Sequence, residues 1–183
     1  RADIVIVTKC PADMKPIEYN IISRWLHLFP YQHLYFTTLD YGKLQAVFPE
    51  KAPARELTLK DLPATAGLMV LTGIANPRPM LQYLARCHAP QEELQYPDHH
   101  DFSSSDLAHI AQRFESMKGT KKYIVTTEKD AARLRSAALD DSVKQALYYL
   151  PIRVRFMQHA GISFDEKITD TIYKNRRIKR PRK

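Results

Sequence analysis

Four consecutive aliphatic residues, Ile4 to Val7, constrain the fold of this chain more than any other feature. A short run that is apolar on both alternating faces is typical of a strand buried on both sides, as in parallel sheets covered by helices. We therefore expect a fully buried parallel strand here. Further aliphatic or aromatic runs that predict strands lie at 34–37, 68–71, 123–126, 146–150 and 153–156.

Helical patterns separate these runs. Apolar side chains three or four residues apart predict helices over 15–28, 77–87 and 103–119, and a last helix over about 164–172. Between 41 and 63 the chain is rich in proline and charge, so we expect an edge strand or an excursion there. The alternation of strands and helices predicts an α/β fold with a mainly parallel sheet flanked by helices.

The charge of the chain is unevenly distributed. The net charge is +8, but residues 171–183 hold seven basic residues and no acidic one, which leaves 21 basic against 20 acidic residues elsewhere. The basicity is therefore a property of the end of the chain and not of the folded body. We expect one α/β lobe over residues 1–170 and a basic tail over 171–183 that could be disordered.

Other features of the sequence limit the class of protein to which the chain can belong. The sequence has no run of about 18 apolar residues that would predict a membrane span, and no secretory leader is recognisable. Cys10 and Cys87 have no second pair with which to form a zinc site, so a reducing compartment is the simplest interpretation. Because the chain lacks an initiator Met and its first strand begins at residue 4, we expect it to be a piece of a longer protein.

Ligands of parallel sheets bind beyond the carboxyl ends of the strands, and three such ends are polar in this chain. These are Thr8-Lys9, the segment from Thr72 to Pro77, and the segment from Thr126 to Asp130. The second has one glycine and precedes a helix whose free N–H groups could receive a phosphate, although an ordinary turn explains the same residues. With five glycines in all, the chain has no phosphate-binding loop of the G-x-x-x-x-G-K-[ST] type.

The segment after the predicted strand 123–126 can be explained structurally. Thr127 and Asp130 have the spacing of an N-cap and the third residue of a helix, and Glu128 and Lys129 fit a solvated helix start. Capping does not explain why two threonines and three charged residues share one sheet edge.

The densest group of titratable residues lies in the segment from Tyr96 to Phe102, which contains Asp98, His99, His100 and Asp101. A histidine beside a carboxylate could serve as a general base, and histidine with aspartate could bind a metal ion. Neighbouring residues of an extended chain point in different directions, which argues against one shared ion. A polar loop whose acids cap the next helix is an equally good explanation.

Taken in order, the motifs VTKCP, LTGIANP, YPDHHDF and TTEKDAARL resemble the C-terminal half of the tetraacyldisaccharide 4'-kinases, the lipid A kinases of Gram-negative bacteria. The resemblance extends from Ala2 to about Val154. It implies the C-terminal lobe of a P-loop NTPase-like kinase that uses ATP and Mg²⁺ to phosphorylate the 4' position of tetraacyldisaccharide 1-phosphate. The implied partners are an N-terminal P-loop lobe of the same protein, the acylated lipid substrate and an anionic membrane surface, at the cytoplasmic face of the inner membrane.

The resemblance also implies roles for individual residues. His99, preceded by Asp98, matches the family histidine that lies near the reacting hydroxyl, so we expect both to be catalytic. The residues that would face the nucleotide and the partner lobe are Thr72, Gly73, Asn76, Glu128, Lys129 and Asp130. The phosphate-binding loop and the Mg²⁺ ligands belong to the absent lobe, so we expect no metal ligand in this chain, weak ATP binding at most, and no kinase activity from this chain alone.

A second interpretation is a non-catalytic α/β binding module whose basic tail recognises an acidic partner or nucleic acid. Stacking surfaces for nucleic acid interleave aromatic and basic residues, and the tail has only Tyr173 at its margin. This composition argues against nucleic acid as a partner.

Overall fold

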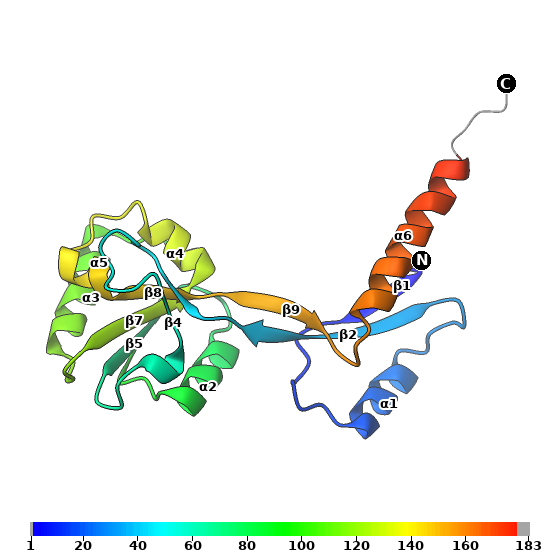
Figure 1. Ribbon diagram of the computed structural model, residues 1–183, viewed down its shortest axis with the longest axis horizontal. Helices are drawn as coiled ribbons and strands as arrows, with labels where there is room; N and C mark the ends of the chain where they lie inside the picture. Colours follow the sequence, from blue (N-terminus) through cyan, green and yellow to red (C-terminus); the bar gives the residue numbers. More distant parts are fainter. Residues whose placement is uncertain (1, 179–183) are drawn as a thin grey trace. The chain divides into compact units, whose positions relative to one another are not determined.

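The computed structural model describes residues 2–178, which form two compact units (Figure 1). The larger unit comprises residues 41–152, and the smaller one comprises residues 2–40 together with 153–178. No helix among the described residues is long and apolar enough to cross a membrane.

The larger unit is built on a six-stranded sheet with the strand order β4-β3-β8-β7-β5-β6. The strands are β3 (Leu44–Ala46), β4 (Glu56–Leu57), β5 (Gly67–Thr72), β6 (Glu92–Gln95), β7 (Lys122–Thr127) and β8 (Leu147–Leu150). Strands β6, β5, β7 and β8 run parallel, whereas β3 is antiparallel to both β8 and β4. The prediction of an α/β fold with a mainly parallel sheet is confirmed.

Helices cover both faces of this sheet. The helical segments are a 3₁₀ turn (Leu59–Asp61), α2 (Arg78–Cys87), α3 (Ser104–Ser116), α4 (Glu128–Leu134) and α5 (Asp141–Ala146). Met69 and Leu71 of β5 pack in a cluster with side chains of α3, α4 and α5. Leu68 and Val70 pack with α2 and the 3₁₀ turn, as the alternation of a strand requires. All six residues of β5 are buried, which makes this strand the centre of the unit.

The smaller unit contains β1 (Ile4–Val7), α1 (Pro16–Trp25), β2 (His33–Tyr41), β9 (Ile152–Phe156) and α6 (Gly161–Ile178). Its sheet has the order β1-β2-β9, with β1 parallel to β2. The ring of Tyr19 in α1 lies edge-on to Phe36 on one face of β2, and Phe164 of α6 lies edge-on to Tyr35 on the other face. The cluster of buried apolar residues in this unit is small and consists of Cys10, Phe36 and Met157.

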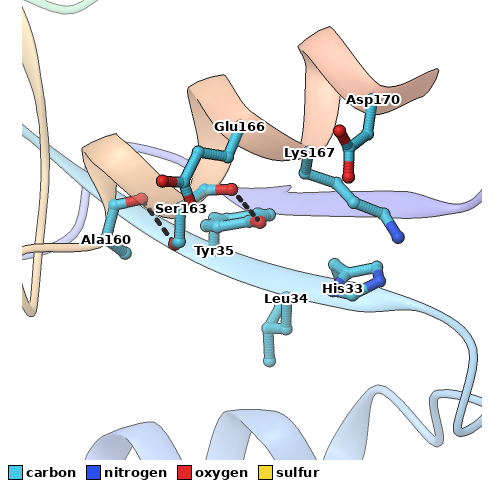
Figure 2. Close-up of a pocket in the computed structure, with 8 residues that line it drawn as sticks. All are labelled: His33, Leu34, Tyr35, Ala160, Ser163, Glu166, Lys167 and Asp170. Carbon is cyan, nitrogen blue, oxygen red and sulfur yellow. Dashed lines mark hydrogen bonds between the residues drawn. The ribbon is translucent and has the colours of Figure 1, made fainter. Parts of the chain in front are cut away.

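A shallow pocket of about 440 Å³ lies between β2 and α6. Figure 2 shows His33 and Tyr35 on the side of the pocket, whereas Leu34 between them points away from it. Ser163 and Glu166 of α6 line the other wall. None of the site residues predicted from the sequence lines this pocket.

Two predictions about the sheets are corrected by the structure, and part of the predicted tail is found in a helix. The first strand is parallel, but it is not fully buried, because Ile6 is 39% exposed. The predicted strands at 34–37 and 153–156 also belong to the three-stranded sheet and not to the sheet of β5 and β7. The first part of the predicted tail is helical, because α6 extends to Ile178. Residues 179–183 lie outside the described residues, and the domain boundary at residue 170 stays a prediction.

Candidate functional site

The segments that follow β5, β6 and β7 begin side by side at the carboxyl edge of the parallel strands in the larger unit. Thr72 at the end of β5 pairs with Gln95 at the end of β6, and Leu71 pairs with Thr126 of β7. The two loops and the helix α4 that follow these strands therefore leave the sheet at the same edge, where parallel sheets bind their ligands. Thr8-Lys9 follows β1 and belongs to the separate sheet of the smaller unit, so it is not part of this edge.

A buried carboxylate of α4 is bound to the loop after β5. The side chain of Asp130 is fully buried and accepts hydrogen bonds from the backbone N–H of Gly73 at 2.9 Å and from the hydroxyl of Thr127 at 2.7 Å. Arg133 donates to the second carboxylate oxygen at 3.2 Å. A Cβ atom at position 73 would lie 3.1 Å from Asp130 Oδ1 and 3.4 Å from the carbonyl oxygen of Pro97, which explains the glycine. Asp130 and Gly73 thus hold the loop after β5 against the first turn of α4.

Asp98 and His99 lie against two cationic side chains of α4. The Lys129 amine is 3.0 Å from Asp98 Oδ1 and 3.2 Å from His99 Nε2, and Arg133 is 3.3 Å from His99 Nδ1. The hydrogen bond from Lys129 lowers the pKa of Asp98 below its usual range. The structure therefore brings together both residues that we expected to be catalytic and one of the expected nucleotide-side residues, Lys129.

The backbone and exposure of His99 suit a group that meets a ligand. Its φ angle is +61°, in the left-handed region that non-glycine residues seldom adopt and that is enriched at functional sites. The backbone N–H of His99 donates to Asp98 Oδ1 at 3.0 Å, which supports this conformation. The His99 side chain is 73% exposed, so a reactant could approach its imidazole ring.

The two cations compete for the one acceptor nitrogen of a neutral His99 ring. In their charged forms arginine and lysine can donate but cannot accept hydrogen bonds, and a neutral imidazole has one acceptor nitrogen. Lys129 already donates to Asp98, whereas Arg133 is held in place by the buried Asp130. This arrangement favours Nδ1 as the acceptor from Arg133, with the ring proton on Nε2.

His100 has a different environment from its neighbour. Its Nε2 atom is 2.9 Å from Asp106 Oδ2, and its ring stacks on Tyr96 with a centroid distance of 4.7 Å. Asp106 also accepts hydrogen bonds from the side chain and backbone of Ser103, which caps α3. These bonds, those from Ser103 first, lower the pKa of Asp106 to about 2. Ser103 and Asp106 therefore form a capping box at the start of α3, and its hydrogen bonds extend to His100.

The other predicted site residues have separate positions. Thr72 is buried within β5, and Asn76 is exposed and accepts a hydrogen bond from the backbone of Arg78 at 3.2 Å. Glu128 is exposed in the first turn of α4. Two hydroxyls near this edge, those of Tyr96 and Thr126, are buried without a hydrogen-bond partner among the described residues.

Arg133 is the residue of this site that sequence reasoning missed. It lies one helical turn after Asp130 and contacts both Asp130 and His99. Its position three residues after an acidic residue on a helix was the available signal, because such side chains are neighbours on the helix surface.

The donor set of this edge does not fit a complete magnesium–nucleotide site. No group of three or more His, Cys, Asp or Glu side chains among residues 2–178 could hold a metal ion. Lys129 and Arg133 are each paired with a carboxylate, and no glycine-rich loop is available to surround phosphates. Residues of this chain alone therefore do not account for binding of Mg²⁺ and the phosphates of a nucleotide.

Comparison with known proteins places these motifs in a family. Residues 1–172 match the family model described as tetraacyldisaccharide-1-P 4'-kinase. The chain is 43% identical over 182 residues to the tetraacyldisaccharide 4'-kinase of Bacteroides thetaiotaomicron, and the match covers 97% of this chain and 48% of the relative. For the Bacteroides fragilis protein of the same name, the identity is 44% over 178 residues, with 97% and 47% covered.

The chain spans about half the length of the curated relatives it matches. A solved structure of LpxK from Aquifex aeolicus in complex with ATP is similar with a TM-score of 0.48 and 13% identity, over 94% of this chain and 52% of that one. The family model and the relatives cover both polar loops and the histidine segment of the sheet edge. On this basis, the chain belongs to the tetraacyldisaccharide-1-P 4'-kinase family.

Proposed function

We propose that this chain is the C-terminal part of an ATP-dependent kinase that phosphorylates the 4' position of tetraacyldisaccharide 1-phosphate in lipid A biosynthesis. Membership of the family supports the reaction class. The observation that carries the assignment of a site is the contact of Asp98 and His99 with Lys129 at the carboxyl edge of the sheet. The alternative of a non-catalytic binding module is not favoured, because the named relatives are kinases.

In this proposal His99 and Asp98 act on the accepting hydroxyl group. With its ring proton on Nε2, the exposed imidazole can donate a hydrogen bond to the oxygen of the 4'-hydroxyl. The adjacent Asp98 carboxylate can accept the hydroxyl proton as the oxygen bonds to the γ-phosphorus and the bond from that phosphorus to ADP breaks. Lys129 keeps Asp98 ionised, in accordance with the lowered pKa of that carboxyl group. Arg133 keeps the imidazole in place through its contact with Nδ1.

The nucleotide-side residues divide into two groups by their positions. Asp130, Gly73 and Thr72 are buried and act by shaping the loops, whereas Asn76, Glu128 and Lys129 are exposed and can face a nucleotide or a partner lobe. The Mg²⁺ ion and most contacts to the phosphates come from an N-terminal P-loop lobe outside this chain. The chain alone is therefore expected to be inactive and to bind ATP weakly at most.

The proposal extends to location. A kinase that acts on an acylated disaccharide must reach a lipid surface, and seven basic residues over 171–183 suit an anionic one at the cytoplasmic face of the inner membrane. Nucleic acid is not proposed as a partner.

The test uses a joined kinase, in which this chain replaces the matching part of the Bacteroides thetaiotaomicron relative. His99→Ala should lower kcat by about 10²-fold or more, because a positioned acid–base group contributes that range. His100→Ala is the matched control: it should lower the melting temperature, since His100 is tied to Asp106 and Tyr96, and should leave kcat of the folded enzyme nearly unchanged. Normal turnover of the His99 variant, or equal losses of kcat in both variants, would refute the assignment.

A further inference from the structure

The contact between Lys129 and Asp98 leaves the carboxylate poorly suited to accept a proton. A general base is most effective when its pKa lies near the working pH. The hydrogen bond from Lys129 instead holds the pKa of Asp98 below its usual range, which makes the carboxylate a weaker proton acceptor. Asp98 is therefore in its less reactive state in this structure.

The two carboxylate oxygens of Asp98 have different surroundings. Oδ1 accepts hydrogen bonds from the Lys129 ammonium and from the backbone N–H of His99, both at 3.0 Å. Oδ2 accepts none from the described residues and lies 3.7 Å from His99 Nε2. With the ring proton on Nε2, a hydroxyl group between these two atoms can accept from the ring and donate to Oδ2. Oδ2 is thus the oxygen that is free to take a proton, while Lys129 holds the other.

The Lys129 ammonium group has more donors than acceptors. It carries three N–H groups, and Asp98 accepts from one of them. Its other close neighbour is His99 Nε2 at 3.2 Å, and this nitrogen cannot accept when it carries the ring proton. Arg133 differs, because its charge is compensated by the buried Asp130. Within the part of the chain that the structure describes, Lys129 therefore lacks acceptors that an anionic ligand could supply.

Lys129 can leave Asp98 without a change in the fold. The two side chains are 42% and 39% exposed, and ion pairs as exposed as this contribute little to stability, because water screens the attraction. The charge of a lysine lies at the end of a flexible four-carbon side chain. Asp130, at the next position of α4, is fully buried and bound to Gly73, so the helix stays in place while the Lys129 side chain moves.

The charges around Asp98 indicate which ligand would draw Lys129 away. Asp98 and the two turns of α4 carry three carboxylates, those of Asp98, Glu128 and Asp130, against the two cations Lys129 and Arg133. The transferred phosphoryl group is also anionic, so a carboxylate that contacts the same hydroxyl group repels it. Lys129 placed between the two anions reduces this repulsion. A phosphate group is also the stronger partner for an ammonium, because it carries more negative charge and more acceptor oxygens than a carboxylate.

We propose that Lys129 exchanges partners during the reaction: it binds Asp98 in the resting enzyme and moves to the γ-phosphate of ATP when the nucleotide is in place. Asp98 Oδ2 then accepts the proton of the 4'-hydroxyl, as that oxygen bonds to the γ-phosphorus and the bond from phosphorus to ADP breaks. Lys129 is thus a catalytic residue that keeps the base masked until the phosphate arrives. This inference rests on the proposed function for the identity of the two substrates.

¹H–¹⁵N spectra of the lysine ammonium groups follow Lys129 directly, and its signal is the one that Lys129→Met removes. In the joined kinase without nucleotide, Asp98→Asn should displace this signal, because it removes the charged partner. A saturating ATP analogue with a methylene group between the β- and γ-phosphorus atoms should also displace the signal, whereas ADP should not. With the analogue bound, Asp98→Asn should have little further effect. The proposal is overturned if the analogue leaves the signal in place, or if Asp98→Asn displaces it equally with and without the analogue.

Nucleotide affinity provides the second measurement. In the joined kinase, Lys129→Met should weaken binding of the analogue by about tenfold or more, since a hydrogen bond between charged groups contributes at least that much, and should change the affinity for ADP by less than about twofold. Lys121→Met is the matched control, because Lys121 is exposed and precedes β7 at the opposite edge of the sheet. It should change neither affinity. Equal affinities of the Lys129 and Lys121 variants for the analogue would contradict the exchange of partners.

Kinase activity is assayed separately on the same proteins. An active joined kinase in which Lys129→Met behaves like Lys121→Met refutes the exchange of partners and leaves the proposed function intact. An inactive joined kinase in which the analogue displaces the Lys129 signal refutes the proposed function and leaves the exchange intact. The melting temperature of Lys129→Met should equal that of the unchanged protein, because the side chain is 42% exposed, and this measurement separates a loss of affinity from a loss of folding.

Discussion

Replacement of Asp130 separates a structural role at the site from a direct contact with the nucleotide. The Asp130 carboxylate is fully buried and accepts from the N–H of Gly73, the hydroxyl of Thr127 and the guanidinium of Arg133. Asp130→Ala removes the acceptor of all three hydrogen bonds at once. The backbone N–H of Gly73 cannot rotate to find another acceptor, whereas the Thr127 hydroxyl and the partly exposed Arg133 can reorient.

The expected loss of stability follows from these three hydrogen bonds. A buried N–H group left without a partner costs about 1–3 kcal/mol, and each hydrogen bond to a charged acceptor contributes about 1.5–3 kcal/mol. Part of this loss is offset, because the variant no longer pays the cost of burying a carboxylate. We therefore expect Asp130→Ala to lower the free energy of unfolding by about 3 kcal/mol. Asp130→Asn keeps an oxygen for Gly73 and should lose less than half of that.

The assay is urea unfolding of the 183-residue chain followed by far-ultraviolet circular dichroism. Asp141→Ala is the matched control, because the Asp141 side chain is 63% exposed and forms a surface ion pair with Lys51. Such pairs contribute about 0–1 kcal/mol, so this change should be nearly neutral. If Asp130→Ala were as mild as Asp141→Ala, the buried carboxylate would not hold the loop after β5 against α4, and a ligand-binding role would be the better explanation.

Two further predictions concern the neighbouring histidines. Because the folded protein holds the pKa of Asp106 at about 2, below its ordinary value of 3.8, this carboxylate stabilises the fold at higher pH, and its contribution is lost as the pH falls from about 3.8 to about 2. Asp106→Asn should flatten the pH dependence of the free energy of unfolding between these two pH values, measured by urea titrations at several pH values. An unchanged pH dependence would show that the hydrogen bonds from Ser103 and His100 do not favour the ionised form of Asp106. Arg133→Lys, which keeps the charge but loses the planar fork, should shift neutral His99 from the Nε2-protonated tautomer towards a mixture, seen in long-range ¹H–¹⁵N spectra of the ring. The His100 ring should keep its signals, and identical His99 spectra in both proteins would rule out Arg133 as the residue that positions the imidazole.

The local sequence pattern was sufficient to predict much of the larger unit. The buried runs around Leu68–Leu71 and Tyr123–Thr126 became central parallel strands, and their polar ends met at one edge, because parallel strands end together. The capping box of α3 was also predictable, since it involves residues three apart. Contacts of this kind are short-range in sequence or follow from sheet geometry alone.

Features that depend on distant residues were not predictable. Strand β6 was missed because it reads Glu-Glu-Leu-Gln and buries only Leu94, as an edge strand can. That strand is what carries Asp98 and His99 to the edge shared with α4. Likewise, the aliphatic pattern of β1 could not show which sheet the strand would join or that Ile6 would remain exposed, because both depend on long-range pairing.

The exposure of Trp25 has a consequence for spectroscopy. Trp25 is the single tryptophan of the chain, it belongs to the smaller unit, and it is 77% exposed. Its fluorescence in the folded chain should therefore resemble that of tryptophan in water, and unfolding should change its emission little. A conventional tryptophan-fluorescence melt would record a nearly flat trace even while the larger unit unfolds cooperatively. The ten tyrosines, six of them in the larger unit, are the informative chromophores of this protein.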